Sequence, residues 1–455
     1  MPFIPHTAAQ TQAMLATLGL GTLDDLFAEI PQALLLKEPI TLPPGLEQAL
    51  DEQGLLQLMQ LRASQDRPLC CFAGAGAYEH YIPQVVGQLL SRGELYSPYT
   101  PYQAEASQGS LQIMFEFQSM MAELLAVDVV NASVYDGASA LAEAVLMALR
   151  CHKKGLHKVL MAASIHPVYR QVVATMTARL GVEIITLPHD NSGRMDEAAW
   201  RRMDAAGLAA VVVAQPNFYG VVEEPDALVD WAQASGALVI AAVNPLCAAV
   251  LRPPGQWGRH GVDIVCGEAQ SLGLPLCGGG PYLGFLGCRM AHVRQLPGRL
   301  VGESRDRQGR RAFTLTLQAR EQHIRRARAT SNICTNQGLC VVASAMTMAL
   351  LGPRGLANKA ATCHGRTREL TERLVRLPGI RRLFTAPFFH EVVLDLGVAA
   401  ESVWLRLADR GFLAGYPLGR CDKKLDHCLL LCATETRSSA QIEALATAMA
   451  QVLGR

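Results

Sequence analysis

The sequence of 455 residues predicts an α/β protein, with a mostly parallel seven-stranded sheet in a large domain and a small α+β domain after it. Seven short apolar segments, most of them unbroken rather than alternating, indicate strands buried on both faces of a sheet. Helical patterns between several of them, such as 169–180 and 225–234, are typical of parallel crossovers. The expected strands are 127–134, 158–163, 183–187, 209–214, 237–243, 263–267 and 282–287.

Three regions follow from these patterns. Residues 1–65 are expected to form a helical arm, residues 66–335 the large domain and residues 336–455 the small domain. In the arm, Leu-rich faces favour a clamp on a partner over a solvent-facing extension. Its expected helices are 8–18 capped by Thr7, 26–30 after a capping box of Thr22 and Asp25, and 46–62. The small domain is expected to have helices at 339–350, 362–377, 402–410 and 438–452, with a break at Gly352-Pro353, and strands at 390–396 and 428–433.

Composition excludes several classes of protein. The 41 basic and 40 acidic residues give a net charge of +1, so no global field selects nucleic acid or a membrane surface. The first basic residue is Lys37, which argues against a targeting segment and favours the cytoplasm. Thirteen cysteines form no C-x-x-C pair, and the run from His427 to Cys432 is interpreted as a buried strand, so no metal site is expected.

A set of local motifs resembles one family along essentially the whole chain. The two most specific stretches are 96–139, which contains the runs 96–103 (YSPYTPYQ), 107–109, 115–118 and 131–139 (NASVYDGAS), and 330–337 (TSNICTNQ). Further matching runs lie at 215–218, 252–255, 267–273 and 278–282. Together they resemble the P-protein family of the glycine cleavage system, and within it the alpha chains, also called subunit 1.

This resemblance implies a fold-type I pyridoxal-phosphate enzyme architecture and a heterotetramer of two alpha and two beta chains. It implies that the beta chain carries pyridoxal phosphate on a lysine. Glycine then loses its carboxyl group as carbon dioxide, and the remaining aminomethyl group passes to the lipoyl arm of the H protein. The chain itself is expected to bind no cofactor covalently.

Residue chemistry agrees with a chain that lacks the cofactor. None of the seven lysines lies between Lys158 and Lys359, and the place where the resembling catalytic chain has a His-Lys pair reads Gln270-Ser271. Neither side chain can form an imine. The strand expected to supply a carboxylate for the pyridinium nitrogen ends instead at Asn244, which carries no negative charge.

The start of the helix after residue 136 could hold a phosphate, because its free N–H groups favour anions. Asp136 stands immediately before it and is interpreted as the N-cap of that helix. His166 follows a strand, at the edge where α/β proteins bind ligands. The resemblance places a cofactor-stacking histidine near it, so His166 is either a vestige of that pocket or a packing residue. No catalytic residue is expected in this chain alone.

The remaining candidates concern partners. Tyr96, Tyr99 and Tyr102 are interleaved with two prolines, which predicts a rigid aromatic loop suited to completing the partner's active site. Asn332 is a further possible donor. The segment 289–328 holds eleven arginines against three acidic residues and is interpreted either as a solvated helix face or as a docking surface for the H protein. Its candidates are Arg305, Arg310 and Arg311.

The sequence therefore predicts the alpha subunit of a glycine decarboxylase that is inactive alone. Two alternatives stay open. One is a scaffold that stabilises the beta chain without touching its active site. The other is an independent enzyme that reuses the degenerate pocket, for example through Ser271, Asp136 and His166, although no G-x-S-x-G motif supports it.

Overall fold

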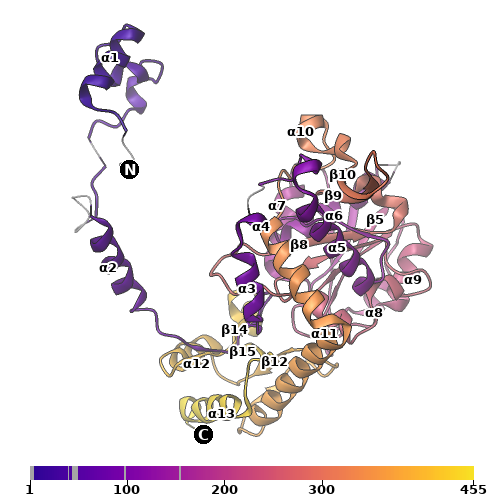
Figure 1. The fold of residues 1–455 in the computed structure, drawn as a ribbon. Coiled ribbons are helices and arrows are strands. Elements are labelled where there is room, and N and C mark those ends of the chain that lie inside the picture. Colours follow the sequence, from indigo (N-terminus) through magenta and orange to yellow (C-terminus); the bar gives the residue numbers. More distant parts are fainter. Residues whose placement is uncertain (1–4, 39, 44–49, 97–98, 153–154, 455) are drawn as a thin grey trace. The chain divides into compact units, whose positions relative to one another are not determined.

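The computed structural model describes residues 5–38, 40–43, 50–96, 99–152 and 155–454. The chain divides into two compact units, Met1–Arg67 and Pro68–Arg455 (Figure 1). In the first unit, Thr7 caps α1 (Ala8–Leu18) as predicted, and α2 spans Glu52–Ala63. Thr22 and Asp25 form the expected reciprocal hydrogen bonds, but the helix there is a short 3₁₀ turn, Asp24–Phe27. The expected helix start at 46 lies outside the described residues.

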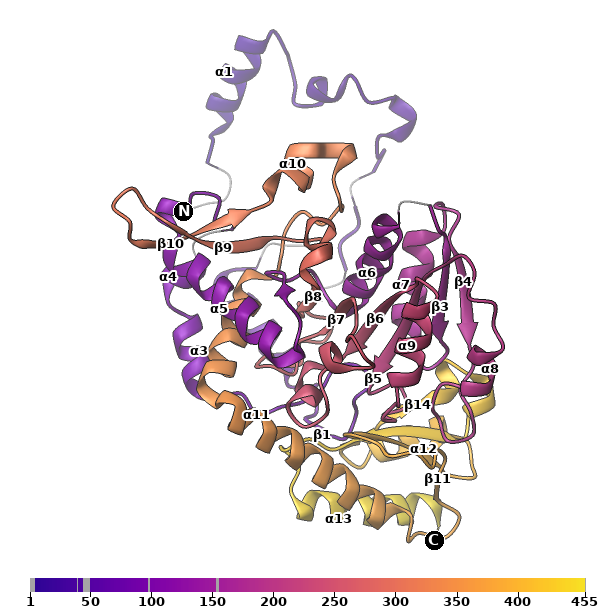
Figure 2. The same cartoon turned by 90° about the vertical axis from the view of Figure 1, so that its right-hand side faces the viewer.

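The second unit is built on a mixed seven-stranded sheet, which confirms the predicted fold class. Each expected strand is present, and their order in the sheet is β2-β8-β7-β6-β5-β3-β4. The pairs β4–β3, β3–β5, β5–β6 and β6–β7 are parallel. Strand β8 runs antiparallel to both of its neighbours, β2 and β7 (Figure 2). The strands are β2 (Val129–Val130), β3 (Lys158–Ala162), β4 (Glu183–Leu187), β5 (Leu208–Gln215), β6 (Leu238–Val243), β7 (Ile264–Glu268) and β8 (Gly284–Cys288).

Helices cover this sheet and bury its continuous apolar strands. Helix α6 (Gly137–Cys151) packs against β5 to β8 with α7 (Pro167–Thr177) beside it, and α9 (Asp226–Ala234) lies against β6. Helix α5 (Gln108–Leu125) packs against β2 and α11 (Gly338–Leu374). All eight residues of β5 are buried, as unbroken apolar strands of a parallel sheet require. The carboxyl ends of β5, β6 and β7 are thereby fixed along one edge.

Helix α11 joins the two cores of this unit. Val341 and Met348 pack in the core around the large sheet, and Leu370 and Leu374 in the core around the small one. The predicted break at Gly352 is a kink with φ 58°, and the helix resumes at Pro353 rather than at 362, because a proline at a first helical position loses no hydrogen bond. Among the described helices, α11 has the length and apolar content of a membrane span, but many of its apolar side chains, such as Val341 and Met348, are buried in the protein core.

The small sheet is antiparallel, with the order β11-β12-β15-β14. Helix α11 reaches α13 beneath it (Figures 1 and 2). The segment that opens the second unit belongs here too, because β1 pairs with β13. The elements are β1 (Cys70–Cys71), β11 (Arg381–Arg382), β12 (Glu391–Asp395), α12 (Ala400–Ala408), β13 (Phe412–Leu413), β14 (Tyr416–Pro417), β15 (Cys428–Cys432) and α13 (Ser439–Leu453).

The centre of the arginine-rich segment is a β-hairpin flanked by short helical turns, so the interpretation of the segment as one helix face is wrong. Strands β9 (Leu300–Arg305) and β10 (Arg311–Thr316) pair antiparallel. Phe313 and Leu315 are buried while the residues between and beside them are more exposed, which is the alternation of a half-buried strand. The arginines around the turn obscured this short alternation.

Candidate functional site

A cavity of about 80 Å³ lies at the carboxyl edge of β5, β6 and β7, the edge at which open α/β sheets bind ligands. Its walls include Asn244 after β6, Glu268 at the end of β7 and His166 before α7. Glu391 of the small sheet and Tyr78 close it from the other side. Candidates from widely separated parts of the sequence therefore meet in one place.

Gln270 and Ser271 are buried beside this cavity, where the resemblance expects a His-Lys pair. The side-chain amide of Gln270 donates to the carbonyl oxygens of Tyr78 (2.8 Å) and Leu274 (2.7 Å) and accepts from the Tyr78 N–H (2.9 Å). The Ser271 hydroxyl donates to Oδ1 of Asn244 at 3.1 Å. Both side chains form structural hydrogen bonds, and among the described residues no general base contacts the Ser271 hydroxyl.

The side chain of Asn244 is held in place by hydrogen bonds to its neighbours. Its Oδ1 accepts from the Leu246 N–H (3.0 Å), and its Nδ2 lies 3.2 Å from Nε2 of His390. Burial lowers the pKa of His390 to about 3, so its ring is neutral and Nε2 can accept from the amide. The position therefore supplies no negative charge.

His166 has both ring nitrogens satisfied within the chain. Its Nε2 donates to the Ala75 carbonyl (2.8 Å), and its Nδ1 accepts from the Val168 N–H (3.2 Å). The ring stacks on Tyr169 at 4.9 Å between centroids and meets Phe218 edge-on at 4.8 Å. Burial lowers the pKa of His166, which keeps it neutral. It lines the cavity as a packed, uncharged ring.

The N-terminus of α6 is occupied by two carboxylates. Asp136 accepts from the Ser139 N–H at 2.8 Å, the N-cap geometry expected from the sequence. Glu268 Oε2 accepts from the Gly137 N–H at 2.9 Å, and its Oε1 accepts from the N–H groups of Gln270 (2.9 Å) and Leu283 (2.8 Å). Burial raises the pKa of Glu268 to about 7, although the three donors favour its charged form.

Glu268 and Glu391 were missed by the sequence reasoning. Glu391 accepts from the Ala75 N–H (2.6 Å) and from the Tyr78 hydroxyl (2.8 Å), and burial raises its pKa to about 7. The available signal was that Glu268 stands at the carboxyl end of a buried apolar strand and Glu391 at the start of one. Their partners lie far away in sequence, so their roles were not visible.

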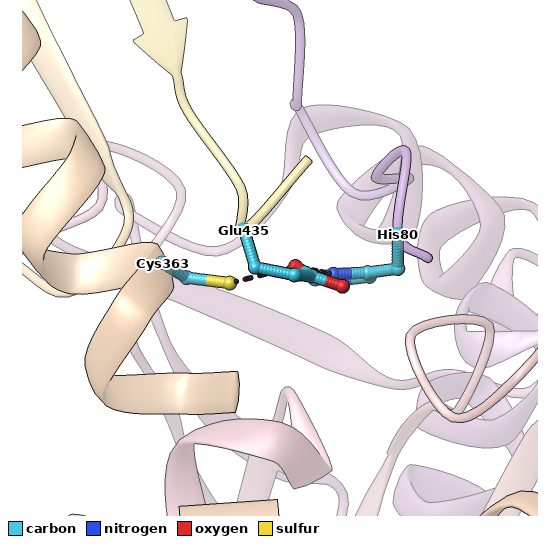
Figure 3. Close-up of side chains that lie close together, drawn as sticks. All are labelled: His80, Cys363 and Glu435. Carbon is cyan, nitrogen blue, oxygen red and sulfur yellow. Dashed lines mark hydrogen bonds and ion pairs between the residues drawn. The ribbon is translucent and has the colours of Figure 1, made fainter. Parts of the chain in front are cut away.

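A buried network around Glu435 adjoins the site (Figure 3). Its carboxylate accepts from His80 Nδ1 (2.8 Å), the Cys363 thiol (3.1 Å) and the Tyr81 N–H (2.9 Å), and Lys359 Nζ lies 3.5 Å away. Burial opposes the charge of Glu435, but His80 and Lys359 outweigh it and lower its pKa to about 2. His80, Cys363 and Glu435 are close enough to hold a metal ion. However, the carboxylate already has four donors, one of them cationic, so the geometry is that of a structural network.

The tyrosine loop lies apart from the residues that line the cavity. Tyr96 ends a short helix, α4 (Gly93–Tyr96), Tyr99 is 86% exposed, and residues 97–98 lie outside the described part of the chain. The Tyr102 hydroxyl accepts from Arg299 (3.0 Å), which also donates to the Cys334 carbonyl (2.6 Å). Arg299 thus ties this loop to the 330–337 run, where Asn332 is exposed. The structure brings together the two most specific motifs, outside the cavity.

The three candidate docking arginines lie near the turn of the β9–β10 hairpin. Arg310 pairs with Asp306 (2.7 Å) and Arg311 with Glu303 (3.0 Å), while Arg305 donates to the Gly309 carbonyl (2.8 Å). All three are exposed. Their charges are partly matched inside the hairpin itself.

The mixed sheet, the small C-terminal sheet and the cavity at the strand ends define the architecture of fold-type I pyridoxal-phosphate enzymes. Glutamate decarboxylase of Lactobacillus brevis CGMCC 1306 shares this fold with a TM-score of 0.67 over 92% of this chain and 95% of that chain, at 13% identity. The chain belongs to the glycine cleavage system P-protein family, whose pattern it matches over residues 1–449.

Two relatives place it more narrowly within that family. The probable glycine dehydrogenase (decarboxylating) subunit 1 of Methylococcus capsulatus is 54% identical over 455 residues, covering 100% of both chains. A crystal structure of glycine decarboxylase (P-protein) in inhibitor-bound form is 42% identical, with a TM-score of 0.88 over 99% of this chain and 100% of that chain.

Pyridoxal phosphate does not fit the residues of this cavity. No lysine stands at 271, Asn244 offers no carboxylate, and Glu268 already holds the start of α6. The volume of about 80 Å³ is also well below the roughly 300–1,000 Å³ of typical ligand pockets. No catalytic step through that cofactor is therefore assigned to this chain.

Proposed function

We propose that this chain is the cofactor-free alpha subunit of a glycine decarboxylase, and that a beta chain carries pyridoxal phosphate on a lysine. The observation that carries the proposal is the pair Gln270-Ser271, whose side chains are buried in structural hydrogen bonds where a Schiff-base lysine is required. The naming of its relatives as subunit 1 supports a partner chain. The expected assembly is two alpha and two beta chains.

In this assembly the beta chain binds glycine and removes its carboxyl group as carbon dioxide. The aminomethyl group then passes to the lipoyl arm of the H protein. The alpha chain is proposed to complete the beta active site with Tyr96, Tyr99, Tyr102 and Asn332, because three of these side chains are exposed aromatics on a loop fastened by Arg299. The hairpin with Arg305, Arg310 and Arg311 is the proposed docking surface for the H protein.

Reconstitution tests this function. The chain purified alone should show no visible cofactor absorbance after incubation with pyridoxal phosphate. Mixed with its beta chain, it should restore glycine-dependent exchange of carbon dioxide. A stoichiometric cofactor on the isolated chain, or full exchange activity by the beta chain alone, contradicts the proposal.

The independent-enzyme alternative fits the site less well, because the side chains it would recruit are already held in hydrogen bonds. For an independent enzyme, Asp136 is committed to Ser139, Ser271 to Asn244 and His166 to Ala75 and Val168. A pure scaffold is distinguished by the variant Tyr99→Phe, which would leave kcat of the reconstituted complex unchanged. The proposed compartment is the cytoplasm, supported by thirteen cysteines that are all free thiols.

A further inference from the structure

The N-terminus of a helix favours anions, because its unpaired N–H groups and the helix dipole both favour negative charge there. In α6 of this chain the first of these N–H groups, that of Gly137, points to Oε2 of Glu268 at 2.9 Å. The other carboxylate oxygen accepts the N–H groups of Gln270 and Leu283, from the loops that follow β7 and precede β8. One side chain therefore collects three backbone donors from three segments.

The fit around Glu268 leaves little space. A Cβ atom at position 137 would collide with the hydroxyl of Tyr169 and would lie only 2.8 Å from the Cβ of Glu268. Glycine at 137 is what allows the glutamate and the tyrosine to approach the helix start. An external anion could reach this N–H only if the Glu268 side chain were displaced.

Charge opposes an external anion as well. Asp136 already caps the Ser139 N–H beside Glu268. Among the described residues that line the cavity there is no lysine or arginine to balance additional negative charge. A phosphate dianion placed beside two carboxylates without a cation would be strongly disfavoured.

We propose that Glu268 is the resident anion of the α6 N-terminus, a built-in carboxylate that occupies the position of an external phosphate or carboxylate ligand. It closes the cavity to phosphorylated ligands and fastens α6 to the β7–β8 connection. Removing this carboxylate should open a site for small oxyanions. The inference concerns this chain alone and does not depend on the activity of the assembled enzyme.

The direct test compares wild type with Glu268→Ala as full-length chains, with inorganic phosphate and formate as probes. Glu268→Ala should have a lower Tm than wild type and should bind phosphate in isothermal titration, whereas wild type should not. At a phosphate concentration ten times the measured Kd, its Tm should rise by about 2 °C relative to equal ionic strength of chloride. Formate should give the same rescue at higher concentration.

Glu223→Ala is the matched control. Glu223 is also a buried carboxyl with a pKa raised by burial to about 7, but it accepts from the Met195 N–H and the Asn217 amide rather than from a helix start. Its alanine variant should lose stability without gaining phosphate binding. Equal phosphate effects on both variants, or phosphate binding by wild type, would overturn the proposal.

Glu268→Gln provides a second measurement if the alanine variant does not fold. The amide oxygen of glutamine can still accept from the N–H groups of Gln270 and Leu283. Its NH₂ group would then face the Gly137 N–H, which would have no acceptor. Hydrogen exchange at the first turn of α6 should then be faster than in wild type, and Glu223→Gln should leave that turn unchanged. Unchanged exchange in Glu268→Gln would contradict the assigned role.

Discussion

The ammonium group of Lys359 donates a hydrogen bond to the carbonyl oxygen of Ser271 at 3.2 Å. A lysine therefore does reach the place where the Schiff-base residue is missing, but from α11 rather than from the loop after β7. It is buried, pairs with Glu435 and does not line the cavity. Its amine is thus committed to a structural contact.

Because of this contact, we expect Lys359 to form no imine with pyridoxal phosphate. Burial lowers the pKa of Lys359, yet its partner Glu435 opposes that effect and favours the protonated, non-nucleophilic amine. The check is borohydride reduction of the full chain incubated with pyridoxal phosphate, followed by peptide mass spectrometry. A phosphopyridoxyl group on Lys359 would contradict this expectation, and the exposed lysines serve as internal controls for non-specific labelling.

The pair of Lys359 and Glu435 should stabilise the fold as a coupled unit. Lys359→Met leaves a buried carboxylate without its cation, and Glu435→Gln leaves a buried ammonium, so each single change should cost about 3–5 kcal/mol. The double variant should cost clearly less than the sum of the two. Urea unfolding of the four proteins measures this coupling, and strict additivity would show that the two residues act independently. The exposed pair Arg420 and Glu401 offers a control cycle in which coupling should stay below about 1 kcal/mol.

Glu223 should make stability depend on pH in a defined direction. Burial raises its folded pKa from 4.5 to about 7, so between these values the folded chain holds a proton that the unfolded chain has lost. The stabilisation is full below pH 4.5 and is lost as the pH rises to 7.

Glu223→Gln imitates the protonated form and removes this titration. We expect wild-type stability relative to Glu223→Gln to fall by up to about 3 kcal/mol between pH 5 and pH 8. Urea midpoints at both pH values test this, with exposed Glu224→Gln as the control, and a constant difference would refute it.

The strands of the large sheet were predictable because burial on both faces imposes unbroken apolar runs that are visible in any short window. The cap at Asp136 was predictable for a similar reason, since its partner Ser139 is only three residues away. The β9–β10 hairpin was not, because its buried positions, Phe313 and Leu315, are few and lie among arginines.

The site itself was only half predictable. The sequence identified Gln270 and Ser271 because no lysine stands there, and Asn244 because it is not a carboxylate. Glu268 escaped because its donor Gly137 is 131 positions away. Glu435 escaped because His80 is 355 positions away. Such contacts depend on how the sheet brings its strand ends together, which local patterns do not specify.

Tyr99 and Tyr102 should respond differently to loss of the hydroxyl. The Tyr102 hydroxyl accepts from Arg299, whose guanidinium also lies 5.4 Å from the ring, so Tyr102→Phe should destabilise the chain by about 1–3 kcal/mol. Tyr99 is 86% exposed, so Tyr99→Phe should leave the Tm of the isolated chain unchanged. In the reconstituted complex, a fall in kcat for Tyr99→Phe with the complex intact supports donation to the partner's active site. Unchanged kcat for that variant favours the scaffold alternative.

Restoring the missing lysine should not restore a cofactor site. In Ser271→Lys, the start of α6 would still be held by Glu268. Asn244 would still lack the negative charge that a protonated pyridine ring requires, and the cavity of about 80 Å³ would become smaller. We therefore expect no visible cofactor band when this variant is incubated with pyridoxal phosphate.

Adding Glu268→Ala and Asn244→Asp to Ser271→Lys frees the start of α6 and supplies the missing carboxylate, so the triple variant should bind the cofactor more tightly than Ser271→Lys does. Absorbance titration of both proteins makes the comparison, and a full band from Ser271→Lys alone would show that the lysine was the only deficit.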